Sequence, residues 1–171
     1  MAEELVRRGY FSLRMGAVVN EPLQTSNPMI IDYSHQSRTD FMDIYLGANC
    51  RFFIGSTGGV NAVPRIFRRP LVYVNFVPFG TDHLLSCAPG SLVVPKKLWL
   101  RQEHRFMTFS EIVESGAGGY FYGENYEPLG IEVIENTADE ISAVAVEMDE
   151  RLNDTWQTTE EDQELQQCFW S

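Results

Sequence analysis

The residues with the clearest chemical potential lie in a glycine-rich turn between an apolar run and a helical pattern. The apolar run covers residues 52–54, and after Gly55 come Ser56, Thr57, Gly58 and Gly59. Hydroxyl groups and free backbone N–H groups can donate hydrogen bonds to phosphate oxygens, and glycine lets a ligand approach the backbone closely. Asn61 is placed to cap the following helix, with Pro64 in its first turn. The pattern predicts an anion site, and a tight strand-to-helix turn without a ligand is the alternative interpretation.

The segments around this turn have the pattern of an α/β protein. Apolar runs of strand length alternate with helical patterns, and the runs cover residues 10–15, 29–33, 51–54 and 71–76. This alternation predicts a Rossmann-like, mostly parallel sheet with helices on both faces. The carboxyl ends of parallel strands meet at one edge of such a sheet, where ligands bind in a crevice. The glycine turn is therefore expected at a ligand-binding edge.

Three helices are predicted outside the glycine turn, two of them from their capping residues. Thr39 opens a helix that ends at Asn49, Thr108 and Glu111 form a capping-box pattern at the start of a second, and a long amphipathic helix covers residues 138–152. The first of these helices places four apolar residues on one face: Phe41, Ile44, Tyr45 and Ala48. Asp40 and Asp43 are expected to be its polar amino end, where acidic groups suit the helix dipole, rather than a pair of metal ligands.

Length and composition indicate one ordinary globular domain. The 171 residues are 44% hydrophobic and 22% charged, and no apolar run approaches the roughly 20 residues of a membrane span. No secretory signal pattern opens the chain, and its three cysteines are widely spaced. Such cysteines suit a reducing compartment rather than a disulfide framework or a zinc site, which predicts a cytoplasmic location.

Charge is distributed unevenly along the chain. Residues 1–105 contain 12 Lys and Arg against 8 Asp and Glu, whereas residues 135–171 contain 11 acidic residues and the single base Arg151. The net charge of −11 is therefore a property of the C-terminal part, and residues 153–171 are expected to form an acidic, solvated tail. The absence of a basic stripe interleaved with aromatics argues against a nucleic-acid partner.

Five segments together resemble a family of bacterial glycosyltransferases with the two-domain GT-B fold, associated with surface-polysaccharide genes. The segments are residues 5–16, 31–34, 40–46, 51–66 and 67–75, and the final helix, rich in Asp and Glu, looks similar as well. They are similar to the C-terminal half of these enzymes, which binds the nucleotide sugar. The resemblance implies that residues 1–171 form one donor-binding domain. It also implies that the chain is a fragment without the acceptor-binding N-terminal domain and the first strand of its own sheet.

The resemblance also implies roles for the polar residues near the strand ends. Arg14, at the end of the first strand, is expected to bind the diphosphate together with the glycine turn, from Ser56 to Gly59 and Asn61. A guanidinium group can bind two phosphate oxygens at once, and such binding needs neither a metal ion nor a cofactor. A surface arginine without a ligand is the alternative interpretation for Arg14.

Four further residues are candidates for the rest of the donor. Asp32 and Tyr33 end the second strand and are expected to contact the base or the ribose, although Asp32 also suits a turn. Asn75 and His83 follow in reach of a bound sugar, and His83 is equally well interpreted as a solvated loop residue. No catalytic residue is assigned, because the acceptor site belongs to the other half of such an enzyme.

The function expected from the sequence is donor binding in a glycosyltransferase that acts in surface polysaccharide or glycan synthesis. Two alternatives stay open: a non-catalytic ligand-binding or assembly domain, and half of a sugar-nucleotide epimerase. If the first strand is missing, residues 10–15 and 51–54 must either pair directly or leave a gap in mid-sheet. Such a gap is expected to be covered by a partner, either a second copy of the chain or the N-terminal domain.

Overall fold

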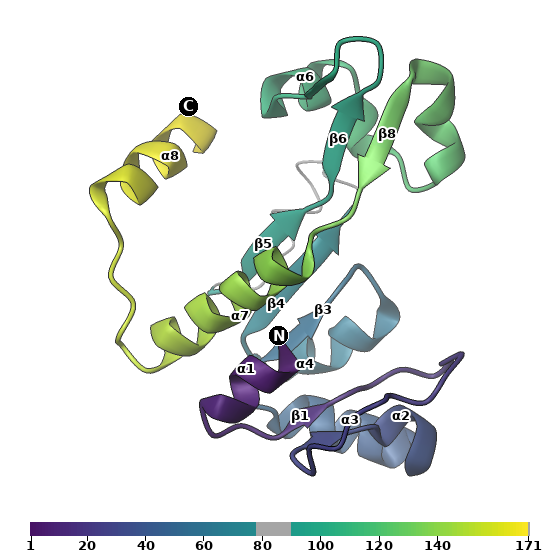
Figure 1. Ribbon diagram of the computed structural model, residues 1–171, viewed down its shortest axis with the longest axis vertical. Coiled ribbons are helices and arrows are strands. Elements are labelled where there is room, and N and C mark those ends of the chain that lie inside the picture. Colours follow the sequence, from purple (N-terminus) through teal and green to yellow (C-terminus); the bar gives the residue numbers. More distant parts are fainter. Residues whose placement is uncertain (78–89, 171) are drawn as a thin grey trace.

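The protein is a mixed α/β chain with small parallel sheets and helices, as the computed structural model in Figure 1 shows. The structure describes residues 1–77 and 90–170, and for Trp170 the backbone alone. The helices are α1 (Ala2–Arg7), α2 (Tyr33–Gln36), α3 (Asp40–Asn49), α4 (Ala62–Ile66), α6 (Phe109–Glu114), α7 (Ala138–Leu152) and α8 (Glu160–Trp170). Short 3-10 turns occupy Gly59–Asn61, Ala117–Gly119, Gly123–Asn125 and Glu127–Leu129.

The four predicted strands exist and pair in parallel, but they form two sheets instead of one, and three of them are shorter than predicted; the strand at residues 71–76 has its predicted bounds. Strand β1 (Ser12–Leu13) pairs with β2 (Ile30–Ile31). Strand β3 (Phe53–Gly55) pairs with β4 (Leu71–Phe76), which pairs with β5 (Leu92–Pro95) on its other edge. Strands β1 and β3 belong to different sheets and do not pair with each other. Of the two arrangements expected for these strands, direct pairing is therefore wrong.

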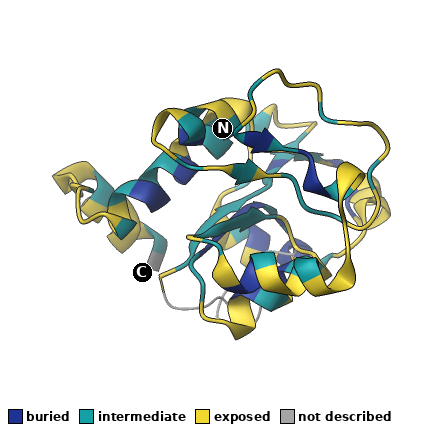
Figure 2. Cartoon of the chain, turned by 90° about the horizontal axis from the view of Figure 1, so that it is seen from below, coloured by how far each residue is buried: buried dark blue, intermediate teal, exposed yellow. Residues whose placement is uncertain are grey.

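Strand β4 is the centre of the core. Leu71 and Tyr73 point into one apolar cluster, and Val72 and Val74 point into another, as the alternation of side chains along a strand requires. Val72 and Val74 pack with Val144 and Met148 of α7, so α7 covers one face of this sheet. The buried residues gather on the strands and the inward sides of the helices (Figure 2).

Asn75 breaks the alternation of β4. It has a φ of +50°, in the left-handed region, and the register with β5 shifts between Tyr73 and Phe76. As a result Phe76 joins the cluster of Leu71 and Tyr73, although strict alternation would place it on the opposite face. That cluster continues into the next sheet through Leu98 and Ile131.

An antiparallel sheet follows that the sequence did not predict. Strand β6 (Lys97–Leu100) pairs with β7 (Arg105–Phe106) on one edge and with β8 (Ile131–Ile134) on the other. Residues 77–106 are rich in proline and glycine, which is typical of loops, and β6 is short and pairs with β8, which lies far along the chain. Two of the predicted helix caps, in contrast, are confirmed: Thr39 accepts from the Met42 N–H, and Thr108 and Glu111 form the predicted capping box.

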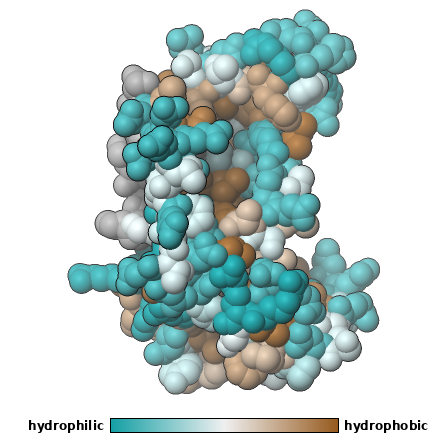
Figure 3. Space-filling view, turned by 60° about the vertical axis from the view of Figure 1, so that its left-hand side comes forward, coloured by the Kyte–Doolittle hydropathy of each residue, from teal (hydrophilic) through white to brown (hydrophobic). Residues whose placement is uncertain are grey.

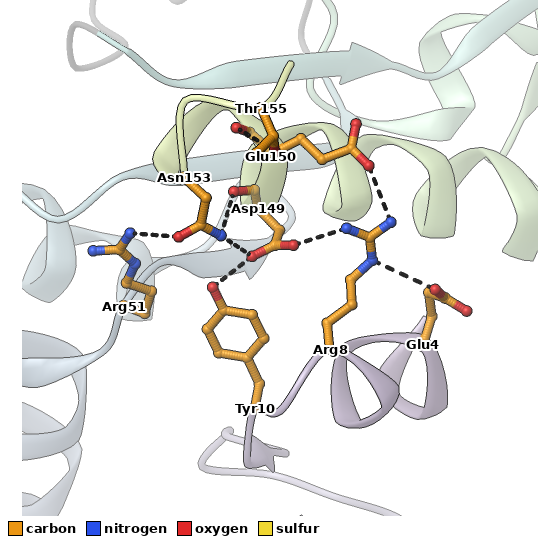
Figure 4. A network of polar contacts seen from close by, with 8 residues as sticks. All are labelled: Glu4, Arg8, Tyr10, Arg51, Asp149, Glu150, Asn153 and Thr155. Atoms are coloured by element: carbon orange, nitrogen blue, oxygen red, sulfur yellow. Dashed lines mark hydrogen bonds and ion pairs between the residues drawn. The ribbon is translucent and has the colours of Figure 1, made fainter.

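A polar network fastens α1 to α7 (Figure 4). The buried carboxylate of Asp149 accepts hydrogen bonds from Arg8 Nη1 at 2.9 Å, from the Tyr10 hydroxyl at 2.6 Å and from Asn153 Nδ2 at 2.7 Å. Arg51 joins the same group by donating to Asn153 Oδ1 at 3.3 Å. Burial works to raise the pKa of Asp149, but the hydrogen bonds from Tyr10 and Arg8 outweigh burial and lower it. The carboxylate therefore stays ionised at neutral pH.

Apolar side chains also remain at the surface. In the face of the molecule shown in Figure 3 they lie between hydrophilic areas. The apolar face predicted for α3 is mostly exposed: Ala48 is buried, but Phe41 is 72% exposed, and Ile44 and Tyr45 are about half exposed. The helix is thus amphipathic as predicted, yet its apolar face packs on no other described element over most of its length.

Candidate functional site

The glycine turn joins the carboxyl end of β3 to α4. Strand β3 ends at Gly55, the 3-10 turn begins at Gly59, and α4 begins at Ala62. The Thr57 hydroxyl donates to the backbone carbonyl of Val77 at 2.8 Å. Because Val77 directly follows β4, this bond ties the turn to the ends of two neighbouring parallel strands.

Asn61 holds the turn in a different way from the one predicted. Its position precedes α4, but its side chain accepts no hydrogen bond from the helix, so the predicted side-chain cap is wrong. Instead Nδ2 donates to the carbonyl of Ser56, which closes the turn. The residue is only 6% exposed, and Oδ1 has no partner among the described residues. A Cβ atom on Gly55 would lie 2.6 Å from this Oδ1, so Gly55 is required by packing.

Gly58 and Gly59 differ from Gly55 because nothing in the described fold requires them. No atom of the described residues lies within 4 Å of the position where a Cβ would stand on either residue. Neither has a positive φ, and Gly58 has an extended backbone with a φ of −152° that any residue adopts. The backbone here is open on the outside, so a ligand can reach it without displacing a side chain.

Arg14 and Asp32 form a fixed ion pair. Arg14 Nε donates to Asp32 Oδ1 at 2.9 Å, and Nη2 donates to Oδ2 at 2.9 Å. Nη2 also donates to the Glu21 carbonyl, and the Ser34 hydroxyl lies 3.2 Å from Nε. Among the hydrogen bonds between described residues none uses Nη1, so this nitrogen has donors left for a ligand. Arg14 is therefore anchored to a buried acid, which neither interpretation of the sequence foresaw.

Asp32 is 4% exposed and accepts from the backbone N–H of Leu23 at 2.8 Å as well as from Arg14. Burial raises the pKa of this carboxyl, but the hydrogen bonds from Leu23, Ser34 and Arg14 outweigh burial and leave the pKa below its ordinary value. An open depression of about 270 Å³ borders Asp32 and is also lined by Thr25, Ser26 and Gln36. Asp32 thus lies at a hollow, with its carboxylate already satisfied.

Tyr33 and Asp43 fasten the start of α3. The Tyr33 hydroxyl lies 2.8 Å from Asp43 Oδ1 and accepts from the Thr39 N–H at 3.1 Å. Burial raises the pKa of this buried tyrosine. Arg38 pairs with Asp43 at 2.8 Å and with Asp40 at 3.2 Å.

Within the described residues no group of three His, Cys, Asp or Glu side chains could hold a metal ion.

Asn75, a candidate for sugar binding, has its side-chain oxygen engaged. Asn75 Oδ1 accepts from the Asn136 N–H at 2.6 Å, and Asn136 Oδ1 accepts from the Asn75 N–H at 2.5 Å. Asn136 Nδ2 donates to the Pro95 carbonyl at 2.9 Å. The pair joins β4 and β5 to the residue before the N-cap of α7. The sequence offers no signal for Asn136, because its partner is 61 positions away. His83 lies outside the described residues.

The structure brings the predicted residues together in two groups. One is the turn, where Ser56 bonds Asn61, and the other is Arg14 with Asp32. No hydrogen bond or ion pair between described residues joins Arg14 to the turn. The segments just before the two strands do touch, since the rings of Tyr10 and Phe52 meet edge to face with their centroids 5.7 Å apart.

Comparisons with known proteins returned no match: no family model, no curated protein and no solved structure is significantly similar to this chain. The helices of the described segments are each too short or too polar to cross a membrane.

Proposed function

We propose that this chain is the nucleotide-sugar-binding domain of a cytoplasmic glycosyltransferase of GT-B architecture, acting in surface polysaccharide or glycan synthesis. The observation that supports it most is the open backbone at Gly58 and Gly59, directly after a parallel strand. Two adjacent glycines that neither φ nor packing requires leave the backbone of the turn free for a ligand to approach.

Arg14 supplies the second part of the proposed site. Its guanidinium is held in place by Asp32 through Nε and Nη2, which leaves Nη1 for a phosphate oxygen. A group that is oriented before the ligand arrives loses little entropy when the ligand binds. The segments just before β1 and β3 are in contact through the Tyr10 and Phe52 rings, and the proposal places the residues that follow these strands at the two ends of one diphosphate.

The proposed chemistry is stabilisation of a leaving group. When a sugar leaves a nucleoside diphosphate, negative charge develops on the oxygen that bound the sugar. Oriented N–H groups of the turn and the Arg14 guanidinium lower the energy of that charge. We also propose that the two parallel sheets, β1–β2 and β3–β4–β5, are parts of one Rossmann-like architecture. Together they would form the donor-binding side of the cleft.

Calorimetric titration with a panel of nucleoside diphosphates and their sugars tests the proposal. We expect one base to be preferred and the Gly58→Val variant to bind at least about tenfold more weakly, because its side chain fills the approach to the backbone. Gly119→Val is the matched control, since Gly119 is also open and has no positive φ. Binding that is unchanged in Gly58→Val, or equally weakened in both variants, would contradict a site at the turn.

A further inference from the structure

A second surface, on α3 and α4, is distinct from the proposed donor site. We name it the α3–α4 face and define it by five exposed apolar residues: Phe41, Ile44, Tyr45, Ile66 and Phe67. The two helices pack directly, since a Cβ on Gly47 would lie 2.9 Å from the Val63 side chain. Phe41 and Tyr45 stack on each other at 6.1 Å, and Ile66 is 74% exposed. Isolated exposed hydrophobics are ordinary, but five on two packed helices indicate an interaction surface.

The charges on this face have no partners among the described residues. Arg65 and Arg68 flank Ile66 and Phe67, and both are exposed. No ion pair between described residues includes either of them, although most of the other arginines are paired. The α4 side of the α3–α4 face is therefore apolar and positively charged, and it suits an amphipathic segment with acidic residues.

The chain itself contains such a segment in α8. Glu161, Glu164, Leu165 and Cys168 follow one another at the spacing of a single helix face, and all four are exposed. Leu165 is 62% exposed, and no ion pair in the described part of the chain includes Glu161 or Glu164. The carboxyl end of α8 is packed on the domain, where the Phe169 and Phe109 rings meet at 4.7 Å. The preceding turns of α8 present an acidic and apolar face to solvent.

The two surfaces lie too far apart to meet within one molecule. In Figure 1, α8 is at the upper left and α3 is near the bottom, and α7 lies at a height between them. Two copies placed side by side in opposite directions would bring each α8 to the α3–α4 face of the other. Such an arrangement has twofold symmetry and closes on itself, because both contacts are the same.

We propose that this chain forms a homodimer in which α8 of each copy packs on the α3–α4 face of its partner. Leu165 would cover Ile66 and Phe67, while Glu161 and Glu164 would pair with Arg65 and Arg68. A helix of 11 residues is only about 16 Å long, so one contact falls short of the about 800 Å² per partner in a typical stable interface. The reciprocal contact doubles the buried area. This inference is independent of the proposed donor binding.

Sedimentation equilibrium with charge-reversal variants tests the dimer. We expect the wild type to approach twice its 19.5 kDa mass at micromolar concentration. Arg65→Glu with Arg68→Glu, and separately Glu161→Arg with Glu164→Arg, should each raise the dissociation constant about tenfold or more, because like charges then face each other. The quadruple variant restores opposite charges and should bind within about threefold of the wild type. Arg101→Glu, an exposed reversal near Glu132 on another sheet, is the control and should leave the mass unchanged.

Three results would each overturn this dimer: a wild-type monomer, a dimer unaffected by both reversals, or a quadruple variant that fails to regain association. An unaffected dimer would point instead to the edges of β1 and β3 that pair with no strand of the described residues. A monomer that binds vesicles of anionic phospholipid through Arg65 and Arg68 would assign the α3–α4 face to a membrane surface.

Discussion

Arg14 and Asp32 form a two-point ion pair in which one nitrogen of the guanidinium, Nη1, is left without a partner among the described residues. A buried acid thus fixes the direction of an arginine at the end of β1. Asp32 was predicted to contact base or ribose, whereas in the structure its carboxylate is used to orient Arg14. The ion pair can stabilise the fold, and it can also hold Arg14 in place for a ligand. Substitution of Asp32 distinguishes these two roles, because the first affects stability and the second affects ligand affinity.

Asp32→Asn should separate these roles. The amide cannot accept both hydrogen bonds as a charged carboxylate does, so Arg14 loses its fixed direction and the urea midpoint of unfolding falls. Affinity for a nucleoside diphosphate should fall as well. Arg14→Lys keeps the positive charge but loses the two-point geometry, and should weaken diphosphate binding similarly. If Asp32→Asn lowers stability and leaves affinity unchanged, then Arg14 is structural only.

Gly55 and Asn61 make a second prediction, about the turn itself. Gly55→Ala should destabilise the fold by about 1–3 kcal/mol, because the new Cβ overlaps Asn61 Oδ1 and comes within 3.0 Å of the Phe53 ring. Denaturation by urea measures the loss. Adding Asn61→Ala removes the overlapping oxygen, so the double variant should be more stable than the sum of the single losses by about 1 kcal/mol. Strict additivity would show that the close contact with Asn61 is not what excludes a side chain at Gly55.

The left-handed backbone of Asn75 predicts an order of stabilities. Asn75→Gly keeps the positive φ but removes the acceptor for the Asn136 N–H, at a cost of about 1–3 kcal/mol. Asn75→Ala loses the same acceptor and must also adopt a strained φ, which adds about 1 kcal/mol. Thermal unfolding should therefore rank the wild type above Asn75→Gly, and Asn75→Gly above Asn75→Ala. Equal stability of the two variants would contradict the strained backbone.

Glu111 predicts an acid-sensitive contribution to stability. Hydrogen bonds from Arg105, and next from the Thr108 N–H, lower the pKa of Glu111 from 4.5 to about 2. Because the folded pKa is below the unfolded pKa, this contribution is complete above about pH 4.5 and is lost as the pH falls toward 2. The free energy of unfolding of Glu111→Gln should therefore depend less steeply on pH in this window. Glu114→Gln, an exposed neighbour, should follow the wild type, and a slope unchanged in Glu111→Gln would contradict the Arg105 contact.

Local features of the fold could be predicted from the sequence, and long-range pairing could not. Helix starts depend on residues three positions apart, so Thr39 and Thr108 were sufficient to locate two of them. The strands at residues 53–55 and 71–76 were marked by their apolar runs. Which strands pair in a sheet depends on contacts between segments that are distant in the sequence. Nothing in the sequences of β1 and β3 indicates that these strands belong to different sheets. The β6–β8 pairing was missed for the same reason.

The same difference between local features and long-range contacts holds for the candidate site. Glycine composition located the turn, because the residues that form it are adjacent in sequence. The side-chain partners could not be predicted: Asn61 turns back to Ser56 instead of capping α4, Arg14 is held by Asp32, and Asn75 is engaged by Asn136. Each of these contacts depends on the packed geometry of at least two segments, which a sequence pattern does not contain.

The most direct test of donor binding follows the backbone N–H groups of the turn by NMR while a nucleoside diphosphate is added. We expect the amide signals of Gly58 and Gly59 to shift with the ligand and to saturate together with the Arg14 side-chain signal. The signals of Gly119 and Gly123, which are equally open but remote in the chain, should not move. Shifts confined to the residues around the depression beside Asp32, or no shift at Gly58 and Gly59 for any nucleoside diphosphate, would contradict donor binding at the turn.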